Sequence, residues 1–140
     1  MNIKHIKEML KNYRKIKAEI IELELRIEEL SHNIHLESPS FTTEGKSYNI
    51  NDSTANKAIN FIDKKEKLER LYKAKKRETL RIDNALNILT DHEKEVIELL
   101  YIKGYKISTV IYSMDRSYKT IKRIENTALY HLEKFLNKEY

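Results

Sequence analysis

The sequence predicts an all-α protein in which a long antiparallel helical hairpin, coiled-coil-like, precedes a small helix-turn-helix domain. Two glycines and one proline in 140 residues leave little material for the tight turns of a sheet. Apolar residues recur at helical spacing over most of the chain. Charged residues make up 35% of the sequence, which requires extensive solvated helix surface in place of one large core.

The first predicted helix covers about residues 3–34. Its apolar residues recur every three or four positions, as in a heptad repeat, namely at Ile3, Ile6, Leu10, Tyr13, Ile16, Ile20, Leu23, Ile27, Leu30 and Ile34. Cations dominate residues 1–17, whereas carboxylates dominate residues 18–30. The narrow apolar stripe predicts a partner helix, which lies either within a hairpin or in a coiled coil with a second chain.

Residues 36–51 predict a long loop, because they hold Pro39 and Gly45 among many Ser, Thr and Asn residues. Asp52 or Ser53 is a suitable N-cap for a second helix. We therefore expect residues 1–87 to form the hairpin and a dimerisation part, and residues 88–140 to form a separate domain.

The second helix is strongly basic in its middle. Nine cations and three anions lie between Lys64 and Arg81. One interpretation is a solvated helix face. The other is a contact with the DNA phosphates that flank a binding site, which would position the protein without sequence specificity. The candidate residues for this contact are Lys73, Lys75, Lys76 and Arg77.

The register of the hairpin bears on this choice. A turn centred near residue 44 places the acidic segment 19–30 beside 57–68. The same register places the basic segment 1–17 beside the equally basic 70–86, which is repulsive unless an anion lies nearby. This doubly basic end is then expected next to the C-terminal domain.

The C-terminal domain opens with a predicted capping box, in which Thr90 and Glu93 satisfy free amides reciprocally. The amphipathic helix that follows is expected to end near Lys103, because Gly104 suits a left-handed C′ position. A short helix is predicted at about 107–113.

Asp115 and Arg116 predict a tight turn, and Ser117 is the expected N-cap of the last helix. Free amides and the helix dipole at such an N-terminus attract phosphate. Lysine or arginine one turn further can bond to guanine edges, and Asn126 to adenine. The candidate DNA-binding residues are Arg116, Ser117, Tyr118, Lys119, Thr120, Lys122, Arg123 and Asn126. The alternative is that they are surface residues of a small helical bundle.

Residues 89–136 resemble region 4 of sigma-70-type RNA polymerase sigma factors. The shared pattern is Leu89-Thr90-x-x-Glu93, Val96-Ile97, Tyr101-x-x-Gly104, Ser117-x-x-Thr120-Ile121-Lys122, and Ala128-Leu129 with Leu132. Two positions depart from the pattern: Ile111 stands where a small alanine is usual, and Asp115 where glycine or asparagine is usual. Both bear on how the helices of the motif cross.

A long N-terminal hairpin before such a domain resembles phage late-gene transcriptional regulators of the ArpU/RinA type. The segments Ser38-Pro39-Ser40-Phe41 and Thr54-Ala55-Asn56-Lys57-Ala58 are also similar to that group. The resemblance implies activation of phage structural or packaging genes by binding near a promoter.

No enzyme, cofactor or metal site is expected. The chain has no cysteine and no glycine-rich phosphate loop, and His32 and His35, near Glu28 and Glu29, are interpreted as surface residues. A net charge of +5 fits a polyanionic partner. No apolar run approaches the ~18 residues of a membrane span, and the N-terminus lacks the features of a secretory signal, so a cytoplasmic protein that binds no membrane is expected.

The predicted function is sequence-specific regulation of transcription on double-stranded DNA, by a homodimer that binds two half-sites. RNA polymerase is a further candidate partner. Two alternatives remain open. A phage small terminase subunit would pair the same motif with an oligomerisation part, and a protein-interaction module would bind polymerase or another protein but no DNA.

Overall fold

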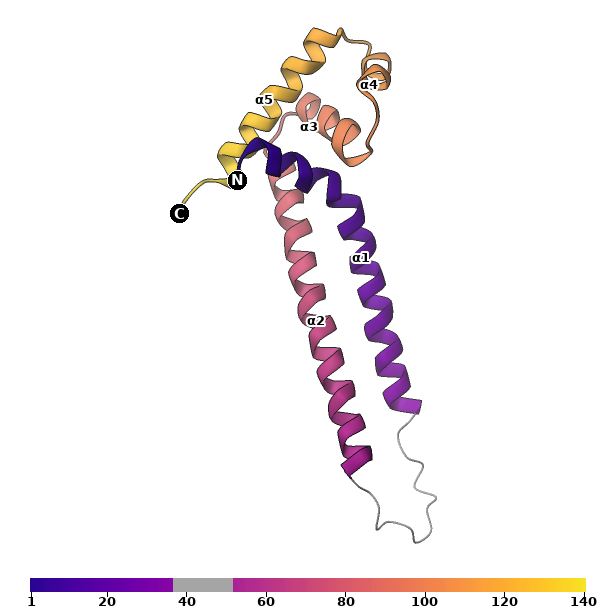
Figure 1. Cartoon of the computed structure of the whole chain (residues 1–140). Coiled ribbons are helices and arrows are strands. Elements are labelled where there is room, and N and C mark those ends of the chain that lie inside the picture. Colours follow the sequence, from indigo (N-terminus) through magenta and orange to yellow (C-terminus); the bar gives the residue numbers. More distant parts are fainter. Residues whose placement is uncertain (37–51) are drawn as a thin grey trace. The chain divides into compact units, whose positions relative to one another are not determined.

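The computed structural model describes residues 1–36 and 52–140, and helices account for its regular structure (Figure 1). In chain order these are α1 (Ile3–Leu36), α2 (Asp52–Asn87), α3 (Asp91–Ile97), the π-helical η2 (Glu98–Ile102), α4 (Ile107–Met114) and α5 (Tyr118–Leu136). No strand occurs in these residues, which confirms the predicted all-α class. No helix among them is long and apolar enough to cross a bilayer. The predicted loop at 36–51, with its Ser38–Phe41 motif, lies outside the described residues from position 37 on.

The chain divides into two units, and the division differs from the expected boundary between residues 87 and 88. Unit 1 combines residues 1–17 with 77–140, and unit 2 consists of residues 18–76. The beginning of α1 and the end of α2 thus belong with the C-terminal helices. The physical reason is the position of the core, which those two helix ends complete.

Two hydrophobic clusters hold unit 1 together. The larger one joins α1, α2, α3, η2 and α5, through Ile6, Leu10, Tyr13, Ile82, Ala85, Leu86, Leu89, Ile97, Tyr101, Ala128, Leu129 and Leu132. The smaller one lies among α3, α4 and α5, and consists of Val96, Val110 and Ile121 with partly buried neighbours. Leu100 packs against both clusters. The helix-turn-helix is therefore held by its own small core and by the ends of α1 and α2.

Of the predicted capping box of α3, the bond to the Thr90 side chain is present, and the carboxylate of Glu93 contacts His131 where a reciprocal bond to the Thr90 amide was expected. Oγ1 of Thr90 accepts a hydrogen bond of 3.4 Å from the amide of Glu93, while the carboxylate of Glu93 lies 3.1 Å from Nδ1 of His131 on α5. The helix ends as predicted at Gly104, which has a left-handed φ of 70°. Thr90 therefore begins the helix as the sequence indicates, and Glu93 also ties it to α5.

The last turn of this helix is π-helical, which the sequence did not predict. The amide of Lys103 donates to the carbonyl of Glu98 at 2.8 Å, so the hydrogen bond spans five residues instead of four. Such a turn inserts one extra residue and changes the direction of the side chains around it. Here it accompanies the burial of Tyr101, whose side chain is directed at α5.

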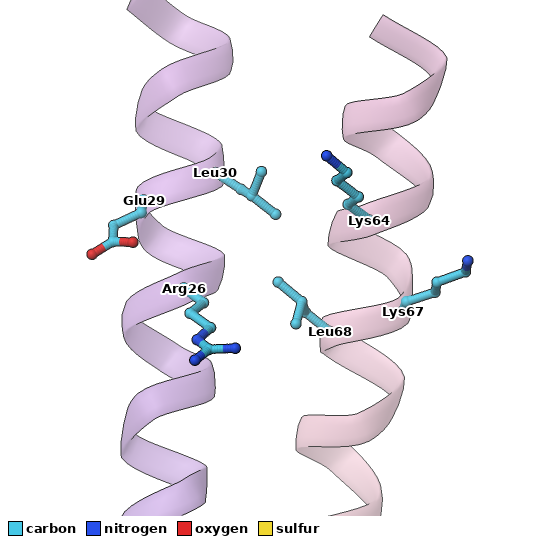
Figure 2. A pocket seen from close by; sticks show the side chains of 6 residues that line it. All are labelled: Arg26, Glu29, Leu30, Lys64, Lys67 and Leu68. Atoms are coloured by element: carbon cyan, nitrogen blue, oxygen red, sulfur yellow. The ribbon is translucent and has the colours of Figure 1, made fainter. Parts of the chain in front are cut away.

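In unit 2, segments of α1 and α2 lie side by side in antiparallel register. The hydroxyl of Tyr72 donates to Glu24 at 2.8 Å, and Nζ of Lys75 lies 2.6 Å from Glu19. Figure 2 shows Leu30 of α1 and Leu68 of α2 pointing into the space between the two helices. Residues 19 and 24 thus face residues 75 and 72, whereas a turn centred near residue 44 would place them opposite about 68 and 63. The predicted register is wrong by about two helical turns.

Charge explains the direction of this shift. The acidic part of α1 lies against the most basic part of α2, so that opposite charges face each other. Residues 55–60 near the start of α2 are exposed, and Ile59 among them is 55% exposed. In unit 1, Tyr13 donates a hydrogen bond to Asp83, so the basic start of α1 lies beside the end of α2 and not beside its basic middle. The doubly basic end that the sequence suggested does not form.

Candidate nucleic-acid interface

The turn between α4 and α5 has the geometry that the sequence predicts. Asp115 adopts a left-handed conformation with φ 51° and ψ 48°, and its amide donates to the carbonyls of Ile111 and Tyr112. Aspartate tolerates this conformation better than most residues. The chain then turns through Arg116 into Ser117, whose extended backbone begins α5. Three residues, 115–117, thus suffice to connect the helices.

Ser117 caps α5 as expected. Its Oγ accepts a hydrogen bond of 3.2 Å from the amide of Thr120, and the hydroxyls of the two residues lie 2.9 Å apart. The other amides of the first turn remain directed along the helix axis, where the dipole favours an anion. The Thr120 hydroxyl, a predicted phosphate contact, therefore also serves the cap.

One side of the first half of α5 carries the predicted DNA-binding residues. Lys119, Arg123 and Asn126 are exposed at spacings of four and three residues, which place them on one face of the helix. Arg116, Ser117 and Tyr118 are also exposed, while Thr120 and Lys122 are half-buried. These eight residues lie together at the start of α5, where Lys119, Arg123 and Asn126 face away from its buried row and Lys122 lies next to it.

A buried carboxylate lies beneath this face. Glu125 of α5 is 5% exposed, and its Oε1 accepts a hydrogen bond of 2.5 Å from the hydroxyl of Tyr101. Its Oε2 lies 3.3 Å from Nζ of Lys122, close enough for an ion pair but without the alignment of a hydrogen bond. Burial, together with the bond to Glu125, raises the pKa of Tyr101 above its ordinary value. Lys122 is thereby drawn toward the core side of the face.

Neither Tyr101 nor Glu125 was identified from the sequence as a site residue. The available signal is a position, since Glu125 is a charged residue in the otherwise apolar row Ile121, Ala128 and Leu132. A carboxylate inside such a row needs a donor or a cation. The aromatic ring of Tyr118, with Nζ of Lys122 5.9 Å from its centroid, completes the surroundings of that lysine.

The predicted phosphate contacts on α2 are partly engaged with neighbouring side chains. Lys75 forms the ion pair with Glu19. Nζ of Lys76 lies 3.3 Å from the hydroxyl of Tyr72 and 5.4 Å from the centre of its ring. Lys73 and Arg77 are exposed. The four residues therefore do not form one uniform basic surface.

Comparisons with known proteins give no match to a family model, a curated protein or a solved structure. Within the described residues, no three His, Asp or Glu side chains form a group that could hold a metal ion. The side chain of His35, considered with His32 as a ligand pair, lies outside the described part of the structure.

Proposed function

We propose that the protein is a sequence-specific regulator of transcription that places the first half of α5 in the major groove of duplex DNA. The observation that carries the proposal is the exposed face of Lys119, Arg123 and Asn126 behind a capped helix start, which follows a short turn with one left-handed residue. Helix-turn-helix proteins contact base edges with these first turns of the second helix. The net charge of +5 supports an anionic partner.

The test is selection of bound duplexes from genomic fragments with the full chain and with Lys122→Ala and Arg123→Ala variants. Each side chain that bonds to a base edge should contribute about 1–3 kcal/mol of discrimination, which is roughly 5- to 150-fold. Lys134→Ala is the matched control, because Lys134 is an exposed cation in the last turn of the same helix. Equal losses of discrimination in Lys122→Ala, Arg123→Ala and Lys134→Ala would contradict a recognition role for the N-terminal half of α5.

The more specific proposal is an activator of phage late genes, and it rests on the resemblance to the ArpU/RinA type. A reporter gene placed behind the selected site should be transcribed more strongly when the protein is present. Lower transcription would instead make the protein a repressor, and unchanged transcription would remove the regulatory role.

We further propose that unit 2 mediates a homodimer, which would place two copies of α5 on two half-sites. Leu23 is the single buried hydrophobic residue that the structure describes in unit 2. By contrast, Ile62 and Leu71 are 53% and 47% exposed. Two helices that bury so little apolar surface gain stability from a further helix pair.

Sedimentation of the full chain should give twice the mass of one chain. The double variant Ile62→Glu/Leu71→Glu should give the mass of one chain. Leu80→Glu is the control, because Leu80 is 58% exposed and lies in unit 1. A ring-sized mass for the unmodified chain would favour a DNA-packaging subunit over a regulator.

A further inference from the structure

A second basic surface lies in unit 1, at the end of η2. An open hollow of about 620 Å³ is bounded by one side of α1 and by the end of η2. Lys11, Arg14, Lys15 and Lys103 contribute its cations, and no carboxylate is among its lining residues. We call this surface the basic hollow.

The cations of the basic hollow differ from those of unit 2 in their surroundings. Within the described residues, none of the four forms an ion pair, and all are exposed. Lys4 and Lys7 extend the same face of α1 toward its start, at spacings of three and four residues. Like charges at this spacing repel one another, so an anion with several charges would stabilise the surface.

The helix end beside the hollow does not supply enough negative charge. The C-terminus of a helix carries about half a negative charge in its carbonyl groups. This is far less than the four positive charges around the end of η2. Most of the positive charge is therefore left for a partner outside the chain.

The position of the hollow in unit 1 indicates which kind of anion it would bind. Its residues Lys103 and Gly104 lead through Lys106 into α4, and the other end of α4 leads into the turn before Ser117. α4 has 8 residues and is therefore about 12 Å long. The major groove is about 12 Å wide and is bordered by phosphates, so a duplex that holds the start of α5 has a backbone within reach of the hollow.

From these observations, we propose that the basic hollow binds backbone phosphates of duplex DNA next to the groove that α5 enters. The proposal rests on the proposed function of α5. In this proposal the phosphate contacts are made by Lys11, Arg14, Lys15 and Lys103, in place of the residues in the middle of α2. Such a contact adds affinity that depends on salt and is independent of sequence.

The experiment measures the affinity of the full chain for a random-sequence duplex across a series of salt concentrations. The variant Lys11→Gln/Arg14→Gln/Lys15→Gln should show a slope of log affinity against log salt that is shallower by up to about 2.7, since each phosphate contact contributes about 0.9. The matched control, Lys64→Gln/Lys67→Gln/Arg70→Gln, removes the same charge from unit 2 and should leave the slope unchanged. Helical content and melting temperature establish that both variants fold, and the three single variants, each with a change of about 0.9, replace the triple variant should it not fold.

An unchanged slope in the hollow variant, or an equal change in the control, overturns the proposal. An unchanged slope together with lost binding to purified RNA polymerase would assign the hollow to a protein partner, which also overturns it. The proposed function of α5 survives these results provided that Lys122→Ala and Arg123→Ala still reduce discrimination among sequences. Absence of any duplex binding by the unmodified chain overturns both.

Discussion

Units 1 and 2 are built on the same two long helices, yet different interactions hold them together. In unit 1, α1 and α2 complete a core with three further helices, and Ile6, Ile82 and Val96 are fully buried. In unit 2, two helices face each other through half-buried side chains and pairs such as Lys75–Glu19. The heptad pattern alone therefore does not determine how much stability a helix pair gains, because packing against further helices decides how much apolar surface is buried.

The largest contrast is expected for leucine truncation. Leu129→Ala in unit 1 removes a side chain that is 2% exposed, and should lower the free energy of unfolding by about 2–5 kcal/mol. Leu25→Ala in unit 2 truncates one that is 49% exposed, and should change it by no more than about 0.5 kcal/mol. Urea unfolding followed by circular dichroism measures both. A loss for Leu25→Ala as large as that for Leu129→Ala would contradict this contrast.

A smaller contrast is expected for two tyrosines that each donate to a glutamate. Tyr101→Phe leaves the buried carboxylate of Glu125 without its tyrosine donor, and should cost about 1–3 kcal/mol. Tyr72→Phe removes the corresponding exposed bond to Glu24. It should lower the free energy of unfolding by less, because water replaces the lost donor. Similar losses of unfolding free energy in the two variants would contradict the difference in burial between the two hydrogen bonds.

The same Tyr101 variant also tests how stability depends on pH. Because the pKa of Tyr101 is raised in the folded chain above its ordinary 10.0, the unfolded chain loses its phenol proton first as the pH rises. Stability is therefore fully present below about pH 10 and declines above it. Tyr101→Phe should remove part of this decline, while the part due to Tyr13, whose pKa is also raised by burial, remains. An identical decline in the variant would show that Tyr101 is not the group concerned.

The smallest effect is expected for the ion pair of unit 2. The side chains of Lys75 and Glu19 are 27% and 34% exposed, so solvent screens much of their attraction. A double-mutant cycle with Lys75→Gln and Glu19→Gln should give a coupling energy of about 0.2–1 kcal/mol, and added salt should reduce it. A coupling that salt does not change would indicate a contact other than charge attraction.

The local features of the fold were predictable from the sequence, because neighbouring residues determine them. The caps at Thr90 and Ser117 and the left-handed residues Asp115 and Gly104 all follow from side-chain chemistry within a few positions. The face at the start of α5 follows from helical spacing. These features locate the candidate interface before any tertiary contact is known.

The remaining features depend on residues that are distant in sequence. The register of α1 against α2 is set by pairs such as Glu24 with Tyr72. Assuming that facing residues are equally far from the centre of the loop does not reveal it. The pairing of Tyr101 with Glu125 needs the π-helical turn, for which residues 98–102 give no recognisable signal. The unit boundary follows from the cluster that joins α1 to α5, and no change in composition marks it.

The π-helical turn at Glu98–Ile102 also affects how this segment tolerates a change in chain length. Deleting one residue from an α-helix rotates every later side chain by about 100°, which usually ruins the packing beyond it. Here the chain already holds one residue more than an α-helical turn needs. A shortening by one residue would restore ordinary spacing and keep Gly104 at the helix end, but it would turn Tyr101 away from Glu125. Loss of a codon here would spare the scaffold and leave the buried carboxylate of Glu125 to Lys122 alone.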